Sequence, residues 1–222
     1  MVPRPTDILV RIPGRMGRVE LPDGEPPFGP WHEVPATELP GLLGNPRVLA
    51  VDGRSGSGKS TLVGRLVAAV PGAAAVHTDD IAWHHDFFDW ADLLAGGVLR
   101  PWRSGADVAY VPPGWAARGR AGAIEVPAAA SLLVVEGVGA ARRALAPLLD
   151  AAVWVQTDRR VGLYRGIARD GEAHRAFWDE WEARERPFLA EDRPWERADL
   201  VVSGAHEGEL VAISAAHDTI RA

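Results

Sequence analysis

Residues 53–60 read Gly-Arg-Ser-Gly-Ser-Gly-Lys-Ser and match the phosphate-binding loop pattern G-x-x-x-x-G-K-[ST]. The apolar run Val48–Val51 before the loop is short and partly β-branched, which predicts a buried strand. After the loop, apolar residues recur at helical spacing from Ser60 until Pro71-Gly72, which predicts a helix. A strand, a glycine loop and a helix in this order predict a phosphate site, because N–H groups and the helix dipole favour an anion there.

The residue types within this loop suit phosphate binding. Glycine allows positive φ and close backbone approach, so successive N–H groups can face phosphate oxygens. The Lys59 ammonium is expected to reach the β- and γ-phosphates of a nucleotide, and the Ser60 hydroxyl to bind Mg²⁺. Lys59 is the only lysine in the sequence, although arginine is common, which suggests that this position needs a compact ammonium. The residues predicted to bind the nucleotide are Gly53, Ser55, Gly56, Ser57, Gly58, Lys59, Ser60 and Thr61.

Length and composition favour one globular domain with an N-terminal extension. The chain has 222 residues, and 47% of them are apolar. Residues 47–222 are expected to form the domain, and the Pro- and Gly-rich residues 1–46 to drape over it as an extension. Within the extension, Ile8–Ile12 and Arg18–Leu21 can pair as a small β-hairpin around Pro13-Gly14.

The charge and the absence of cysteine exclude several classes of function. A net charge of −6 disfavours nucleic acid as a partner, because such binding usually needs a basic face. Without cysteine there is no disulfide framework and no thiolate metal site. No apolar stretch reaches the length of a membrane span, and Met1–Pro5 lacks the apolar core of a signal peptide. We therefore expect a cytoplasmic protein without membrane contact, as a monomer or a homodimer.

Acidic residues follow two of the predicted buried strands. Asp79 and Asp80 come directly after the strand Ala73–His77, and Glu136 ends the strand that begins near Ser131. Ligands collect at the carboxyl ends of strands in a doubly wound sheet, so these acids are expected near the phosphates. A helix N-cap with a solvated charge is the alternative for the two aspartates. Glu136 is expected to hold the metal through water, beside the Ser60 hydroxyl, or to position the attacking group; an ordinary strand-ending glutamate is the alternative.

The rest of the chain alternates strands and helices, which is typical of an α/β fold with a mainly parallel sheet. Arg165 and Arg169 lie four residues apart on one face of a predicted helix, where they can neutralise charge on a transferring phosphate. A solvated basic face is the alternative. After Ser203 the sequence is expected to be peripheral. The predicted helices are Arg142–Leu149, Asp158–Asp170 and Glu172–Glu191, and the predicted strands are Ala151–Val155 and Asp199–Ser203.

An aromatic and proline-rich insert lies between the acidic strands. Leu99–Gly105 and Tyr110–Arg118 combine aromatics, arginines and prolines, which suits a substrate lid or pocket wall. His84 and His85 are adjacent and therefore point to different sides of a helix or strand, so they make a poor metal pair. We interpret these histidines as structural or substrate-pocket residues.

Taken in order, these segments resemble the uridine kinase-like branch of the P-loop kinases over about residues 47–204. The resemblance implies the three-layer sandwich fold of the P-loop NTPases, with ATP and Mg²⁺ as phosphate donor and a small-molecule hydroxyl as acceptor. It also implies that Asp79, or Asp80 in its place, is the general base, and that Arg165 and Arg169 belong to a lid near the γ-phosphate. It rests on the phosphate loop and on Thr78–Asp80, Val134–Gly137, Arg165–Asp170 and Arg197–Val202.

The sequence departs from this family at two places. Pro113-Gly114-Trp115 stands where the family carries Tyr-Asp and an aromatic residue to read a nucleoside, and Gly162 stands where it carries a lid arginine. The resemblance therefore implies the chemistry without the identity of the acceptor. A nucleotide-binding switch, or a kinase relic that binds ATP without transferring phosphate, is the alternative function.

Overall fold

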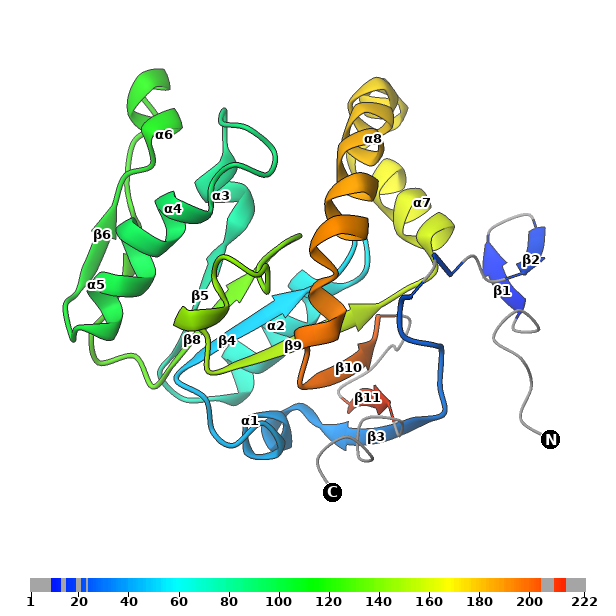
Figure 1. Ribbon diagram of the computed structural model, residues 1–222, viewed down its shortest axis with the longest axis horizontal. Coiled ribbons are helices and arrows are strands. Elements are labelled where there is room, and N and C mark those ends of the chain that lie inside the picture. The colour runs from blue at the N-terminus through cyan, green and yellow to red at the C-terminus, as the bar shows by residue number, and fades with distance from the viewer. Residues whose placement is uncertain (1–8, 13–14, 19–20, 23, 205–209, 215–222) are drawn as a thin grey trace.

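A seven-stranded sheet forms the centre of the computed structural model, which describes residues 9–12, 15–18, 21–22, 24–204 and 210–214 (Figure 1). The strand order is β3-β11-β10-β9-β4-β8-β5. The five strands from β10 to β5 are parallel, whereas β11 pairs antiparallel with β10 and with β3. The strands are β3 (Trp31–Pro35), β4 (Val48–Asp52), β5 (Ala73–His77), β8 (Leu132–Glu136), β9 (Ala151–Gln156), β10 (Leu200–Ser203) and β11 (Leu210–Ser214).

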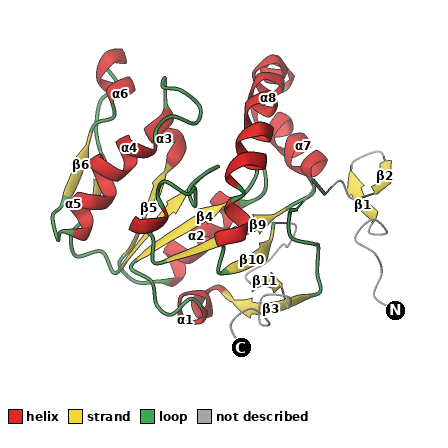
Figure 2. Ribbon diagram, in the orientation of Figure 1, coloured by secondary structure: helices red, strands yellow, loops and turns green. Residues whose placement is uncertain are grey.

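Helices cover both faces of this sheet (Figure 2), which confirms the predicted three-layer α/β sandwich. The longer helices are α2 (Lys59–Ala69), α7 (Arg159–Asp170) and α8 (Arg175–Asp192). Shorter helices are α1 (Leu39–Leu42), α3 (Thr78–Ala82), α4 (Ala91–Leu94), α5 (Arg100–Arg103) and α6 (Pro113–Arg118), with a π-helical segment (Ala95–Leu99) joining α4 to α5. Two small antiparallel ribbons are β1 (Leu9–Ile12) with β2 (Arg15–Arg18), and β6 (Val108–Tyr110) with β7 (Ile124–Val126).

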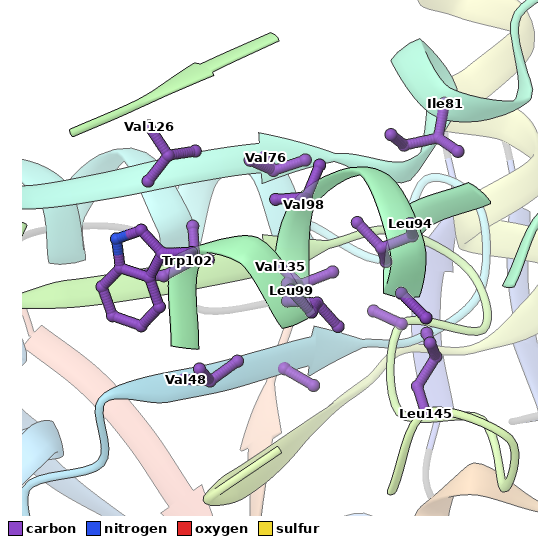
Figure 3. Close-up of a cluster of buried hydrophobic side chains, with 14 of the residues drawn as sticks. Val48, Val76, Ile81, Leu94, Val98, Leu99, Trp102, Val126, Val135 and Leu145 are labelled. Atoms are coloured by element: carbon purple, nitrogen blue, oxygen red, sulfur yellow. The ribbon is translucent and has the colours of Figure 1, made fainter. Parts of the chain in front are cut away.

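The alternation of side chains along β4 divides the core into two layers. Val48 and Ala50 face a cluster that includes Trp102 and residues of α3 to α6, part of which Figure 3 shows. Leu49 and Val51 face the opposite layer, where they pack with residues of α1 and α2. A strand that is apolar on both faces must be covered on both sides, so β4 holds the phosphate loop at the middle of the sheet.

Residues 210–214 were predicted to be peripheral, and this prediction is wrong. They form β11, whose Val211, Ala212 and Ile213 are buried between β10 and β3. The partner β3 comes from the predicted extension, so residues 31–35 form an edge strand of the main sheet. The division of the chain at residue 46 stays a prediction.

The predicted hairpin is present, with its second strand at Arg15–Arg18 instead of Arg18–Leu21. Its Pro13-Gly14 turn lies outside the described residues, as does Met1–Pro5. None of the helices in the part of the chain that the structure describes is long and apolar enough to cross a bilayer.

The prediction of a helix over Arg142–Leu149 is also wrong, because this segment is a series of turns with one 3-10 turn at Ala146–Leu148. Backbone N–H groups here are bonded elsewhere: that of Ala141 donates to Asp52, and that of Arg143 donates to Asp192. Pro147 lies inside the predicted helix, where it has no N–H to donate and its ring would clash with the carbonyl group of Arg143, so a regular helix is disfavoured here.

Candidate active site

A cavity of about 410 Å³ lies at the carboxyl ends of β4, β5 and β8. Six of the eight residues predicted to bind the nucleotide line it, and so do Asp79, Glu136, Arg165 and Arg169. The cavity therefore brings together residues as distant in sequence as Ser55 and Gly204. The sequence predicted that the acids would lie near the phosphate loop, and Asp79 and Glu136 line this cavity with the loop. The six lining residues of the phosphate loop are Ser55, Gly56, Gly58, Lys59, Ser60 and Thr61.

The phosphate loop has the left-handed conformations for which its glycines were predicted. Gly56 has φ 70° and Gly58 has φ 102°, and α2 begins directly afterwards at Lys59. The buried Lys59 Nζ donates to the carbonyl oxygen of Arg54 at 2.9 Å. Gly53 and Ser57 do not line the cavity; the Ser57 side chain is fully buried, and its Oγ has no hydrogen-bond partner among the described residues.

Helix α7 contacts the phosphate loop through two glycines. A Cβ atom on Gly56 would lie 2.7 Å from the carbonyl carbon of Gly162 and closer still to its oxygen. A Cβ atom on Gly162 would lie 2.7 Å from the carbonyl oxygen of Ser55. An arginine does not fit at position 162 with the two backbones this close, which gives a physical reason for the departure from the family pattern.

Arg165 and Arg169, which the resemblance assigned to a lid, line the cavity and also contact other groups of the protein. Arg165 Nη1 donates to the carbonyl oxygen of Gly204 at 2.8 Å, across from α7 to the end of β10. Arg169 pairs with the carboxylate of Asp170 at 2.7 Å, and its side chain is largely exposed. Trp178 of α8 also lines the cavity and donates through Nε1 to Asp170.

The structure separates the two aspartates that follow β5. Asp79 opens into the cavity, whereas Asp80 Oδ1 accepts from Arg120 Nη2 at 2.8 Å and is not among the lining residues. The residue at the helix N-cap is His77, and neither carboxylate caps the helix, so the capping alternative is wrong. Surrounding protein disfavours the charged form of Asp79 and raises the pKa of its carboxyl above the usual 3.8, although Lys59 nearby opposes this.

Glu136 lies beside the residue predicted to share a metal with it. The Ser60 hydroxyl hydrogen-bonds to its carboxylate, and His77 Nδ1 lies 2.6 Å from its Oε2. Burial alone would raise the pKa of Glu136, but the bond from His77 and the charge of Lys59 hold it below its usual value. The same bond raises the pKa of His77.

The hydroxyl of Ser60 and the carboxylate of Glu136 fit Mg²⁺ as ligands. The described residues contain no group of three or more His, Asp or Glu side chains that could hold a metal ion. Mg²⁺ in phosphate-transfer sites is usually bound by one or two protein oxygens together with substrate phosphates and water. One hydroxyl and one ionised carboxylate, at Ser60 and Glu136, are ligands of that kind.

Asp52 is a residue for which the sequence analysis predicted no role. Its side chain is fully buried at the end of β4, and it accepts three backbone N–H groups, from Gly53 at 2.7 Å, Gly139 at 2.8 Å and Ala141 at 2.9 Å. Burial raises its pKa to about 6 in spite of these bonds. The carboxylate thus joins the start of the phosphate loop to the turn after Glu136.

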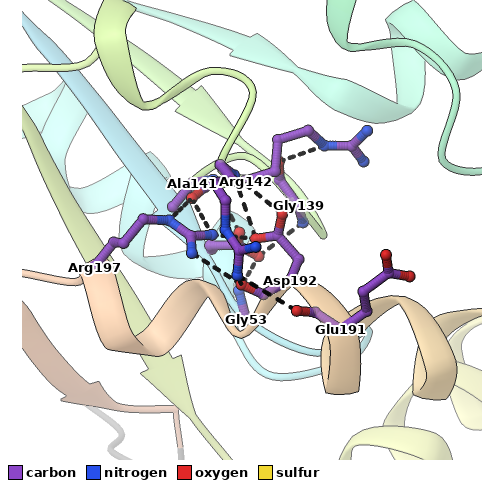
Figure 4. Close-up of polar contacts among 9 residues, drawn as sticks. Gly53, Gly139, Ala141, Arg142, Glu191, Asp192 and Arg197 are labelled. Atoms are coloured by element: carbon purple, nitrogen blue, oxygen red, sulfur yellow. Dashed lines mark hydrogen bonds and ion pairs between the residues drawn. The ribbon is translucent and has the colours of Figure 1, made fainter.

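The polar contacts continue from this turn to the end of α8 (Figure 4). Arg197 donates through Nε to the carbonyl oxygen of Ala141 at 3.2 Å and through Nη1 to that of Asp192 at 2.8 Å. Arg142 donates through Nε to the carbonyl oxygen of Gly139 at 3.1 Å. The turn after Glu136 is therefore held by β4 on one side and by the end of α8 on the other.

The two tryptophans of the aromatic insert belong to the core, whereas Pro101 and Tyr110 of the insert line a pocket separate from the candidate site. Trp102 and Trp115 are buried, and no residue of Leu99–Gly105 or Tyr110–Arg118 lines the cavity. Trp115 Nε1 donates to the carbonyl oxygen of Asp80 at 2.8 Å, and Arg120 lies over the Trp115 ring, 3.5 Å from its centroid. The tryptophans lie here because the apolar side chains on this face of β5 and β8 are stabilised when they are buried.

Two solved structures to which the chain is similar are kinases by name, whereas no protein-family model and no curated protein matches the chain. One is a possible uridine kinase from Bacillus stearothermophilus, with 20% identity, 69% of this chain and 86% of that chain covered, and a TM-score of 0.46. Another is a "putative fructose transport system kinase" from Silicibacter sp. TM1040, with 20% identity, coverages of 74% and 95%, and a TM-score of 0.45. At this identity the likeness is one of fold alone.

Proposed function

We propose that this protein is an ATP-dependent kinase that transfers the γ-phosphate to a hydroxyl group of a small molecule. The observation that carries the proposal is the position of Asp79: it opens into the cavity that Lys59, Glu136 and the phosphate loop also line. Binding of phosphate needs the loop and Lys59, and binding of Mg²⁺ can use Glu136, but neither needs the carboxylate of Asp79. A carboxylate there is useful if a proton must be removed from an acceptor.

The nucleotide would lie along the cavity from the phosphate loop toward α2 and β10. Its phosphates would contact the N–H groups of the loop and the Lys59 ammonium, and the loop glycines leave room for them. The cavity continues between α2 and the strands β10 and β11, where the nucleoside would fit. Its lining here includes Leu62, Arg65, Ser203 and Val211. Mg²⁺, held by Ser60 and Glu136, would neutralise charge on the phosphate oxygens.

In the transfer step the acceptor hydroxyl oxygen forms a bond to the γ-phosphorus, and the bond from that phosphorus to the bridging oxygen of the departing ADP breaks. Asp79 accepts the hydroxyl proton. Its raised pKa brings the carboxylate closer to the operating pH, which favours proton transfer. Lys59, Arg165 and Arg169, which all line the cavity, stabilise charge on the transferring group.

A nucleotide-binding switch is the second candidate, and one observation favours it. The segment Pro113–Trp115, where the resembling family reads its acceptor, packs against the body of the protein: a Cβ atom on Gly114 would fall on the carbonyl oxygen of Trp83. A switch predicts tight binding of ATP with negligible turnover for every acceptor.

The test is ATP consumption in the presence of Mg²⁺, screened against nucleosides, sugars, vitamins and hydroxylated antibiotics, with mass spectrometry of the products. The proposal predicts that at least one hydroxylated compound stimulates consumption and gains one phosphoryl group. Binding of ATP without phosphorylation of any compound would favour the switch. We further propose that the enzyme works in the cytoplasm, and a homodimer stays a prediction that sedimentation can test.

A further inference from the structure

Three charged side chains are buried together against the outer side of the phosphate loop. Arg54 belongs to the loop, Glu25 comes from the N-terminal segment and Glu185 from α8, and their exposed fractions are 5%, 6% and 3%. Arg54 Nε donates to Glu25 Oε1 at 2.8 Å, and its Nη2 contacts the same oxygen. Arg54 Nη1 lies 3.8 Å from Glu185 Oε2. Buried charges of this kind are costly to the fold unless they are paired, so each depends on the others.

Glu185 also bonds to the backbone of the loop. Its Oε1 accepts from the Ser55 N–H at 2.7 Å and from Trp181 Nε1 at 3.3 Å. Ser55 was predicted to bind phosphate through the loop backbone, but its own N–H is committed to this carboxylate. The following residue, Gly56, is where the loop takes its left-handed turn. The bond from Glu185 therefore fixes the chain immediately before that turn.

Glu25 is held in place from the sheet. Gln156, fully buried at the end of β9, donates through Nε2 to the carbonyl oxygen of Pro26 at 2.9 Å and lies 3.4 Å from Glu25 Oε2. The N-terminal segment is thereby anchored where it meets Arg54. Burial raises the pKa of Glu25, with the Arg54 charge beside it acting in the opposite direction.

Glu25 and Glu185 hold the side chain of Arg54, and the backbone of Arg54 positions Lys59. The Arg54 carbonyl oxygen accepts from Lys59 Nζ at 2.9 Å and from the Ser57 N–H at 3.0 Å. A rotation of the Arg54 backbone would move both of these donors. The position of Arg54 is thus linked through one carbonyl group to the ammonium that is proposed to meet the phosphates.

We infer that Glu25 and Glu185 are positioning residues for nucleotide binding, which hold Arg54 and Ser55 so that the phosphate loop and Lys59 are arranged for phosphate before it binds. Preorganised donors bind more tightly because less freedom is lost on binding. The inference rests on the nucleotide binding of the proposed function. It also gives the N-terminal segment around Glu25 a share in the site, although this segment precedes the whole phosphate-loop motif in sequence.

The test compares the dissociation constants of ATP with Mg²⁺ for Glu185→Ala, Glu185→Gln and Glu25→Gln by calorimetry. Glu180→Gln on the exposed side of α8 and Glu38→Gln in the N-terminal segment are the matched controls. Glu185→Ala should weaken binding roughly 10- to 100-fold, as for the loss of a hydrogen-bonded charged group. Glu185→Gln keeps an oxygen for the Ser55 N–H and should recover part of this loss, and both controls should bind like the wild type.

Urea midpoints measured on the same samples separate positioning from general stability. Glutamine keeps the size of glutamate, so the two Gln variants remain informative even if Glu185→Ala does not fold. Dissociation constants within twofold of the wild type in both folded Gln variants would overturn the inference and leave the proposed function standing. Failure of the wild-type protein itself to bind ATP would overturn both.

Discussion

The contact between the phosphate loop and α7 predicts a large effect of one added methyl group. In Gly56→Ala the new Cβ would lie 2.7 Å from the carbonyl carbon of Gly162, a separation that real Cβ atoms essentially never show. The obstacle is backbone, so it cannot rotate away as a flexible side chain could. Residue 56 also has φ 70°, and an L-residue there costs about 1–2 kcal/mol. Forcing extra volume into a packed contact adds about 1–3 kcal/mol.

The sum predicts that Gly56→Ala lowers the free energy of unfolding by about 2–5 kcal/mol. Urea denaturation followed by tryptophan fluorescence measures this change in the free energy of unfolding. The midpoint should fall while the slope m stays constant. Gly64→Ala is the matched control: Gly64 lies in the middle of α2 with no atom within 4 Å of its added Cβ, and this substitution should stabilise by about 0.5–1 kcal/mol. A wild-type midpoint for Gly56→Ala would show that the described contact between the phosphate loop and α7 is wrong.

Three further predictions follow from the site. Lys59→Ala should abolish phosphoryl transfer and weaken ATP binding, a loss of roughly 3 kcal/mol or more at the transition state, measured by turnover and calorimetry; near-wild-type turnover would contradict the kinase proposal. Asp80→Asn should keep turnover within a few fold, because Asp80 pairs with Arg120 outside the cavity, and a fall as large as that expected of the base would show that Asp80 acts in place of Asp79. The His77–Glu136 pair should make stability depend on pH: the pKa of His77 is raised above 6.5 in the folded protein, so its contribution is complete below pH 6.5 and is lost as the pH rises through the folded value. Urea midpoints of the wild type and His77→Gln across pH 5.5–8.5 test this, and parallel curves would contradict it.

The parts of the fold that could be predicted from the sequence have strong local patterns. The strand before Gly53, the helix after Gly58 and the strand that ends at Glu136 all have patterns that can be read in their own residues. The acids gather at one cavity because parallel strands end at the same edge of the sheet. The sequence therefore predicted that Asp79 and the phosphate loop lie at one cavity, whereas the roles of these residues stay predictions.

The errors have both local and long-range causes. Leu210–Ile213 is an apolar run typical of a buried strand, but its pairing with β3, about 180 residues earlier in the chain, could not be predicted from that run. The Arg142–Leu149 error has a local cause, because Pro147 lies inside the predicted helix and disfavours a helix interior. The ion pair between Glu25 and Arg54 joins residues on either side of a proline-rich stretch. Nothing in the spacing of these residues indicates their partners.

The central claim is that Asp79 removes a proton from the acceptor, and Asp79→Asn tests it most directly. Asparagine keeps the size of the side chain and loses the ability to take the proton, whereas the phosphate loop, Ser60 and Glu136 remain. With an acceptor from the screen, single-turnover transfer should therefore fall by about 10²- to 10⁴-fold, while the dissociation constant of ATP with Mg²⁺ changes little. Transfer within a few fold of the wild type would show that Asp79 is not the base.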